Sequence, residues 1–209
     1  IFNIGIFSQI IEITPPFPTI NDIITIHYDA TQGNGGLQGI SPVYTHTGVV
    51  TQSGLPSSWT YVQGNWGQAD PNVLMTDLGN NLHEITIDID QFYGFPANTN
   101  VAKLAFVFRN TDGSMEGKTA SMGDIFYPVY PVNAGFQAAI FRPYEDVLVS
   151  LNDTIHLKAQ SNGNATLEIY DNGILITSTS NSTILQHDHV VNLSGDHEII
   201  LIANDGSSI

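Results

Sequence analysis

Short runs in which apolar and polar residues alternate dominate the chain, and they predict β-strands. In residues 23–30, Ile24, Ile26 and Tyr28 fall on one face, with polar residues between them. Further runs of this kind occupy residues 43–51, 73–78, 82–89, 101–109 and 124–130. Gly79-Asn80-Asn81 separates two of them and is typical of a hairpin turn. The one weak helical pattern covers residues 88–94. We therefore expect an all-β fold.

The composition changes near residues 131–137, and both tryptophans lie before this point. The runs that follow are short and are separated by turns, as in immunoglobulin-like sandwiches, although the Cys…Trp…Cys pattern is missing. They cover residues 147–151, 154–160, 165–170, 174–179, 183–193 and 197–204, and Asp171-Asn172-Gly173 predicts a hairpin turn. The chain is expected to form two tandem β-sandwich domains, at residues 10–130 and 131–209. The second is expected to be immunoglobulin-like and truncated.

Residues 1–9 form a separate segment. The apolar stretch IFNIGIF is followed by Ser8 and Gln9, which is typical of the end of a signal peptide; an ordinary first strand is the alternative. The sequence contains no run of about 20 apolar residues, so no membrane span is predicted. We expect a protein that is secreted or held at the cell surface.

The composition excludes several classes of function. The chain has 209 residues, with five basic and 20 acidic side chains and a net charge of −15. Such a chain repels phosphate backbones, so a nucleic-acid partner is not expected. Cysteine is absent, which excludes disulfides, zinc-thiolate sites and cysteine nucleophiles. With only 12% charged residues, the polar surface must consist largely of neutral side chains, which suits neutral extracellular ligands.

A group of aromatic residues provides the main candidate site. Tyr44 and His46 lie two residues apart on a predicted strand and share a face; Trp59 and Tyr61 repeat that spacing, and Trp66 follows in a Gly-Asn-Trp-Gly loop. Flat aromatic rings pack against the C–H faces of sugars, while neighbouring polar side chains bind hydroxyl groups. We therefore interpret the group as a carbohydrate-binding site. The alternative is that the tryptophans belong to the core of a small sandwich.

Other polar groups are weaker candidates. Asn110 and Asp112 follow a buried strand and could bind a sugar or Ca²⁺, although a hydrogen-bonded turn is the simpler interpretation. Residues 29–36 match neither an EF-hand nor a phosphate loop and are expected to form a turn. His187 and His189 share a strand face but are too few for a zinc site. His197 is expected to be a surface residue. We expect no metal or other cofactor, and calcium is unsupported.

No positive signal for catalysis is found. A GxSxG nucleophile motif is absent. Glycosidases need two carboxyl groups across a cleft, but glutamate is scarce, and Asp70 and Asp124 are undistinguished. The chain itself is therefore not expected to be an enzyme.

An ordered series of segments resembles the N-terminal region of secreted bacterial alpha-amylase-family enzymes, glycoside hydrolase family 13. These segments are residues 18–26, 29–37 (DATQGNGGL), 43–50 (VYTHTGVV), 59–67 (WTYVQGNWG), 104–114 (LAFVFRNTDGS) and 123–127 (GDIFY). The same region is similar, more distantly, to starch-binding carbohydrate-binding modules of families 25 and 26.

Within that second resemblance, Tyr44 and His46 match the early strand and Trp59 matches the tryptophan that follows it. Residues 106–110 match a later strand, with Asp112 in its turn. Residues 115–117 (MEG) depart from the Asp/Asn run usual there, and Trp66 has no clear counterpart.

The resemblance implies a non-catalytic starch- or α-glucan-binding accessory region of an amylase-like glycoside hydrolase. Its partners would be an α-glucan polysaccharide or maltooligosaccharide and a C-terminal catalytic domain in a longer protein. Two alternatives remain open: spacer domains that support a catalytic barrel, and surface adhesin modules. Coplanar, solvent-facing rings would favour sugar binding, and an irregular aromatic patch would favour a spacer.

Overall fold

The computed structural model describes residues 10–51, 58–96, 98–143 and 146–207. The contacts divide the chain into a first unit, which ends at Asn133, and a second unit, which begins at Ala134. In the described part, regular structure is almost entirely β-strand, which confirms the predicted fold class. No described helix is long and apolar enough to cross a membrane. The predicted signal-peptide remnant, residues 1–9, lies outside the described residues.

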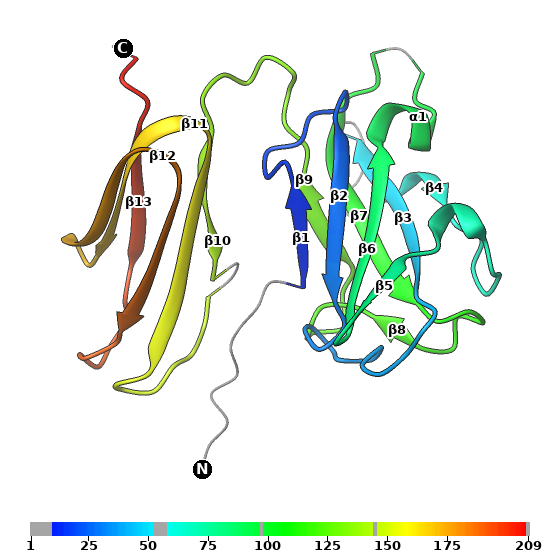
Figure 1. The fold of residues 1–209 in the computed structure, drawn as a ribbon, viewed down its shortest axis with the longest axis horizontal. Coiled ribbons are helices and arrows are strands. Elements are labelled where there is room, and N and C mark those ends of the chain that lie inside the picture. Colours follow the sequence, from blue (N-terminus) through cyan, green and yellow to red (C-terminus); the bar gives the residue numbers. More distant parts are fainter. Residues whose placement is uncertain (1–9, 52–57, 97, 144–145, 208–209) are drawn as a thin grey trace. The chain divides into compact units, whose positions relative to one another are not determined.

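The first unit consists of two antiparallel sheets (Figure 1). One sheet has the order β1-β2-β6-β5, with bounds Ile11–Thr14, Ile23–Asp29, Leu82–Asp88 and Thr76–Gly79. The other has the order β4-β3-β7-β8, with bounds Thr60–Gln63, Tyr44–Thr51, Val101–Arg109 and Glu116–Gly117; β9 (Ile125–Pro128) also pairs with β7.

The core of the first unit lies between these two sheets. The predicted alternation in β2 holds, since Ile24, Ile26 and Tyr28 are all buried. The Tyr28 ring stacks on Phe108 of β7, with ring centroids 3.9 Å apart. This contact joins the two sheets, so the side chains that alternate with Phe108 along β7 lie on the outer face of the second sheet.

The first unit also contains two short helical elements. The weak helical pattern at residues 88–94 corresponds to α1 (Ile89–Tyr93), where the Asp88 side chain accepts a hydrogen bond from the Gln91 amide and Gly94 ends the helix in the left-handed conformation. The strand predicted over residues 73–78 begins only at Thr76. Asp70 and Pro71 instead start a 3-10 turn, Pro71–Val73.

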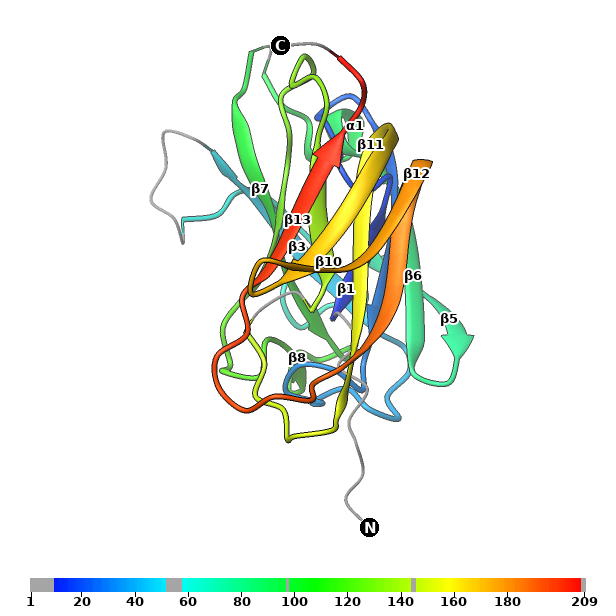
Figure 2. The same cartoon turned by 90° about the vertical axis from the view of Figure 1, so that its left-hand side faces the viewer.

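The second unit contains β10 (Ala138–Arg142), β11 (Thr154–Asp171), β12 (Ile174–Val190) and β13 (Ile199–Asn204). β11 pairs with β12 along its length, and its other edge pairs with β10 and then with β13. β11 and β12 each span two of the predicted short strands. The pairing of β11 with β12 shifts register between Gln160 and Leu167, and both strands bend over there (Figure 2).

The bend folds this hairpin onto itself. The buried cluster of the second unit combines Leu157 and Ala159 from the first half of β11 with Leu167 and Ile169 from the second half. Leu185 of β12 belongs to the same buried cluster. The two halves of one hairpin therefore act as the two layers of this core.

Candidate functional site

Three aromatic side chains meet on the outer face of the second sheet of the first unit: His46, Trp59 and Trp66. The His46 ring stacks on Trp59, with centroids 5.8 Å apart and an interplanar angle of 26°. Trp66 contacts the same imidazole edge-on, at 5.2 Å and 90°. His46 and Trp59 are half-buried, and Trp66 is 43% exposed. We call His46, Trp59 and Trp66 the aromatic cluster.

A glycine and a bulge place Trp59 over the sheet. A Cβ at Gly48 would meet Trp59 and Val62, so both side chains lie on the face to which Gly48 points. Trp59 and Val62 are three residues apart, which a regular strand does not allow on one face. Tyr61 provides the extra residue, with φ of 51° and a register shift in the pairing of β3 with β4.

The bulge also separates Tyr61 from the aromatic cluster. Its ring contacts Phe95 edge-on at 5.3 Å, and Phe95 stacks on Tyr93 of α1. Regular alternation predicted that Trp59 and Tyr61 would share a face; their different neighbours show that the bulge breaks this alternation.

Tyr44 shares the outer face with His46 but is buried, at 6% exposure. The guanidinium carbon of Arg109 lies 5.1 Å from the centre of the Tyr44 ring, so this ring packs beneath a cation. Tyr44 therefore offers little surface for stacking on a ligand.

Arg109 is a residue that the sequence analysis did not single out, and it organises the loops around the cluster. It is fully buried. Nη2 donates to the carbonyls of Asn65 and Gln68 at 2.8 and 2.7 Å, and Nη1 donates to those of Asn110 and Thr111 at 3.0 and 3.1 Å. Burial lowers the pKa of Arg109. One side chain thus ties the Trp66 loop to the turn after β7.

Asn110 and Asp112 use their side chains within that turn. The Asn110 amide donates to the Ser114 hydroxyl and accepts from the Met115 amide. Asp112 accepts from both the hydroxyl and the backbone N–H of Ser114, and these hydrogen bonds lower its pKa. Their known contacts are those of the hydrogen-bonded turn. Residues 29–36 form a turn as well, in which Asp29 accepts from Thr31.

The turn nevertheless touches the aromatic cluster through Gly113. This residue has φ of 72°, and a Cβ on it would fall 2.6 Å from the indole nitrogen of Trp66. Only glycine allows the indole to lie so close to this backbone conformation. The structure therefore brings together His46, Trp59, Trp66 and the turn at 110–114, and it leaves Tyr44 buried and Tyr61 apart.

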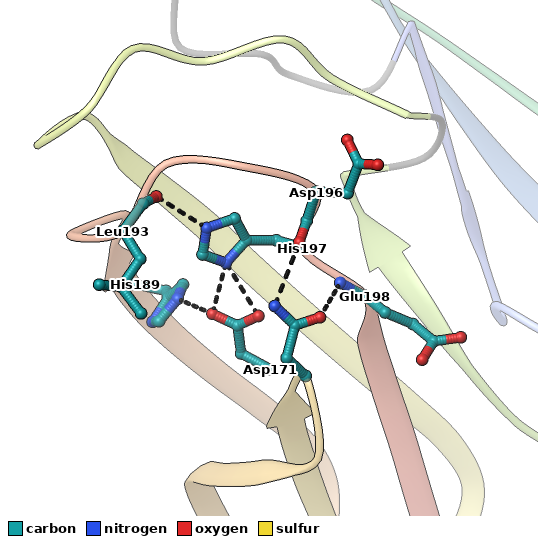
Figure 3. A network of polar contacts seen from close by, with 7 residues as sticks. Asp171, His189, Leu193, Asp196, His197 and Glu198 are labelled. Carbon is teal, nitrogen blue, oxygen red and sulfur yellow. Dashed lines mark hydrogen bonds and ion pairs between the residues drawn. The ribbon is translucent and has the colours of Figure 1, made fainter.

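A second polar cluster lies in the second unit (Figure 3). The carboxylate of Asp171 contacts His189 Nε2 at 2.9 Å and His197 Nδ1 at 2.7 Å, and His197 Nε2 lies 3.0 Å from the Leu193 carbonyl oxygen. The side chains of Asp171, His189 and His197 are only 12–14% exposed. We call these three residues the His–Asp cluster.

The His–Asp cluster corrects one prediction and adds to another. His197 was expected to be a surface residue, but it is mostly enclosed and directly bonded to Asp171. The histidine that joins it is His189, whereas His187 only lies beside His189, with ring centroids 6.2 Å apart. Asp171 is 18 residues from His189 and 26 from His197, so short-range spacing could not reveal the group.

Hydrogen bonding shifts the pKa values in this cluster. Burial alone would raise the pKa of Asp171, but the hydrogen bonds from His197 and His189 outweigh it and lower the pKa. The Leu193 carbonyl and then the Asp171 carboxylate raise the pKa of His197. Both shifts favour a charged pair.

Comparison with known proteins identifies a family but no function. No curated protein matches the chain. Residues 11–116, about half of the chain, match the family described as Domain of unknown function (DUF8578). This match includes the whole aromatic cluster and the turn at 110–114, and it ends before the His–Asp cluster. The chain therefore belongs to the DUF8578 family.

Proposed function

We propose that the first unit is a non-catalytic carbohydrate-binding module that holds an α-glucan at the aromatic cluster. The observation that carries this proposal is the contact of one imidazole with two indoles on the outer face of a sheet, where Trp66 is 43% exposed. Large aromatic rings left in part to solvent offer apolar area that a sugar ring can cover.

The polar atoms of the cluster suit a neutral, hydroxyl-rich ligand. His46 Nδ1 lies 2.6 Å from the Gly64 carbonyl oxygen, which can only accept, so this nitrogen carries the proton in the neutral ring. Nε2 is then an acceptor for a hydroxyl group. The indole nitrogen of Trp59 is buried without a hydrogen-bond partner in the described part of the chain. Any exposed surface of the Trp59 side chain is therefore carbon, which suits stacking.

The angle between the rings favours a curved ligand. Trp59 is inclined by 26° to His46 and Trp66 by 90°, so the two indole planes are far from parallel. The flat, coplanar platform that would match a ribbon-like chain such as cellulose is not formed. An α-1,4-linked glucan is curved, and successive sugar rings can meet inclined surfaces. The proposed ligand is accordingly starch, glycogen or a maltooligosaccharide.

In this role the protein acts outside the cell, joined to a C-terminal catalytic domain of an amylase-like hydrolase. Few stacking contacts give weak binding, with a dissociation constant of roughly 10–1000 µM. Tethering converts weak binding into a high local concentration of substrate around the catalytic domain.

A second candidate function is that of a spacer. Three observations favour it: Tyr44 is buried under Arg109, Asn110 and Asp112 bond within their own turn, and the rings of the aromatic cluster are not coplanar. On this interpretation the aromatic cluster packs against a neighbouring domain and binds no sugar.

Titration of the full chain with maltoheptaose distinguishes the two candidates. Both tryptophans belong to the cluster, so saturable fluorescence quenching reports occupancy of the site. By calorimetry, Trp59→Ala and Trp66→Ala should each weaken binding by about tenfold or more, which corresponds to about 1.4 kcal/mol. Tyr61→Phe is the matched aromatic control and should leave affinity unchanged, because Tyr61 contacts Phe95 instead.

Cellohexaose and xylohexaose test the class of ligand, and both should bind more weakly than maltoheptaose. A silent titration with all three sugars up to roughly 5 mM, well above the expected range, contradicts the binding function and favours the spacer. Equal binding of all three contradicts the assignment to α-glucans alone.

A further inference from the structure

We propose that Asp171, His189 and His197 form a binding site for a divalent transition-metal ion such as Zn²⁺. This site belongs to the second unit and does not depend on the sugar-binding proposal. Two imidazoles and one carboxylate are a ligand set that such ions accept, with a further position left for water. Calcium and magnesium prefer sites made of oxygen atoms, and this set is a poor match for them.

The donor atoms already lie close to the spacing of a coordination shell. Asp171 Oδ2 is 2.9 Å from His189 Nε2 and 2.7 Å from His197 Nδ1. Ligand atoms about 2.1 Å from a zinc ion are about 3.0 Å apart at right angles and about 3.4 Å apart in a tetrahedron. The two O···N distances would have to lengthen by about 0.5 and 0.7 Å for a tetrahedral shell, and all three donor atoms already lie within 4.8 Å of one another.

The partners of the two His197 ring nitrogens determine where the ring carries protons. His197 Nε2 faces the Leu193 carbonyl oxygen at 3.0 Å, and a carbonyl only accepts, so Nε2 carries a proton. In a neutral His197 ring, Nδ1 would then direct a lone pair at the Asp171 carboxylate, 2.7 Å away. Two acceptors cannot face each other at that distance without a cation between them. A proton on His197 Nδ1 fills this position in the metal-free chain, and a divalent ion would take its place.

The contact of His197 with Leu193 also has the form found around metal ligands. Metal-binding histidines almost always donate their second ring N–H to a carbonyl or carboxylate, which fixes the ring and its tautomer. Here the Leu193 carbonyl fixes His197, and Nδ1 points into the cluster (Figure 3). A metal ion would displace the proton from Nδ1, so binding should release a proton.

Hydrogen bonds of the Asn172 side chain hold the backbone around the His–Asp cluster in place. The Asn172 amide donates to the Asp196 carbonyl and accepts from the Glu198 N–H, which holds the segment that carries His197 against the turn that carries Asp171. A groove of about 710 Å³ runs beside it, with Leu193, Asp196 and His197 in its lining. His197 is the one proposed ligand that lines this groove, so an ion would approach the cluster from the His197 side.

Metal titration of the full chain, prepared without a histidine tag and stripped with EDTA, tests the site. We expect one Zn²⁺ per chain by calorimetry, and one Co²⁺ per chain by its visible absorption. His197→Gln and Asp171→Asn should each weaken binding by about 10–100-fold or more. Mg²⁺ and Ca²⁺ at the same concentration should give no saturable signal.

Two other histidines provide matched controls. His156 Nδ1 contacts Asp188 at 2.6 Å, but this pair is exposed, and no third ligand joins it among the described residues. His187 lies beside His189 without joining the cluster. His156→Gln and His187→Gln should bind Zn²⁺ with unchanged affinity.

A measurement on the unmodified chain removes any dependence on the folding of variants. In imidazole NMR spectra, paramagnetic Co²⁺ should broaden the signals of His189 and His197 at substoichiometric amounts, before those of the other five histidines. Three results would overturn the proposal: no saturable binding of Zn²⁺ or Co²⁺ below roughly 1 mM, equal weakening in the His156→Gln control, or uniform broadening of all histidine signals.

Discussion

The two units bury the apolar faces of antiparallel strands in different ways. The first unit packs two separate sheets against each other and joins them through large rings such as Tyr28 and Phe108. The second unit folds one long hairpin onto itself, and small residues such as Ala159 and Ala165 lie in its core. Both units leave some aliphatic side chains exposed, for example Ile23 at 63% in the first and Ile174 at 70% in the second, but the second unit has far fewer buried apolar side chains. The first unit therefore depends on core packing, and the second depends more on polar contacts that hold its bend and its ends.

The largest effect is expected from the core of the first unit. Phe108→Ala removes a fully buried ring and its stack on Tyr28, which should cost about 3–5 kcal/mol of unfolding free energy. Both tryptophans lie in the first unit, so urea unfolding followed by tryptophan fluorescence reports on that unit. Phe126→Ala on the same sheet is the control; Phe126 is only half-buried and should cost clearly less. Equal losses would contradict the role given to the Tyr28–Phe108 contact.

Arg109 is the exception to core packing in the first unit, and its removal should be nearly as costly. Arg109→Met leaves four backbone carbonyls without their charged donor, and we expect a loss of about 3 kcal/mol. Arg109→Lys keeps the charge but not the fork that reaches both loops, so it should rescue only part of the loss. The same fluorescence measurement applies. Full rescue by lysine would show that charge alone matters.

The contribution of polar contacts to the stability of the second unit can be tested at its bend. The Asn162 side chain accepts from the Gln137 amide and donates to the Gly135 carbonyl, both at 2.8 Å. Asn162→Ala should therefore destabilise the second unit by about 1–2 kcal/mol, measured by far-UV circular dichroism during urea unfolding. Asn164→Ala, two residues away and exposed, is the matched control and should have little effect. If both variants behave alike, the bend is held by packing and not by Asn162.

The sequence predicts those parts of the fold that depend on local alternation. Residues 101–109 were predicted as a strand and form β7 with those bounds, and the helix at α1 was visible from residues 88–94. The bend in β11 was read as a break between two strands, because polar residues 161–164 interrupt the apolar pattern. Nothing in that pattern shows that one strand continues through the bend, where its pairing with β12 is interrupted between Gln160 and Ala165.

Local alternation predicts even less of the candidate sites, because they depend on contacts between distant segments. The pairing of Tyr44 with His46 on one face was predictable from a period of two, but the cover over Tyr44 depends on Arg109, which reaches loops more than 40 residues away. The displacement of Tyr61 depends on one positive φ. The His–Asp cluster forms only because the hairpin folds back, so its members are invisible to short-range spacing.

The smallest effect is expected from pH, and it arises in the core of the first unit. His83 is 2% exposed, its ring stacks on Tyr28 at 6.1 Å, and its Nδ1 is buried without a partner among the described residues. Burial lowers the pKa of His83, although the nearby Asp77 opposes the shift. The unfolded chain therefore takes up this proton at a higher pH than the folded chain does. As the pH falls from about 7.5 through the ordinary histidine range, the unfolded state gains stability relative to the folded state.

One proton can change the unfolding free energy by no more than about 1.4 kcal/mol per pH unit, so the expected slope is modest. Asp77 and Asp112 have lowered pKa values, and their contribution is lost only at more acidic pH. Urea midpoints from tryptophan fluorescence at pH 5, 6 and 7.5 should fall toward acid in the unmodified chain and fall less in His83→Gln. The difference between the two chains isolates His83 from the other histidines of the first unit. An identical slope in both would mean that the pKa of His83 is the same in the folded and unfolded states, and that its burial does not contribute to the pH dependence.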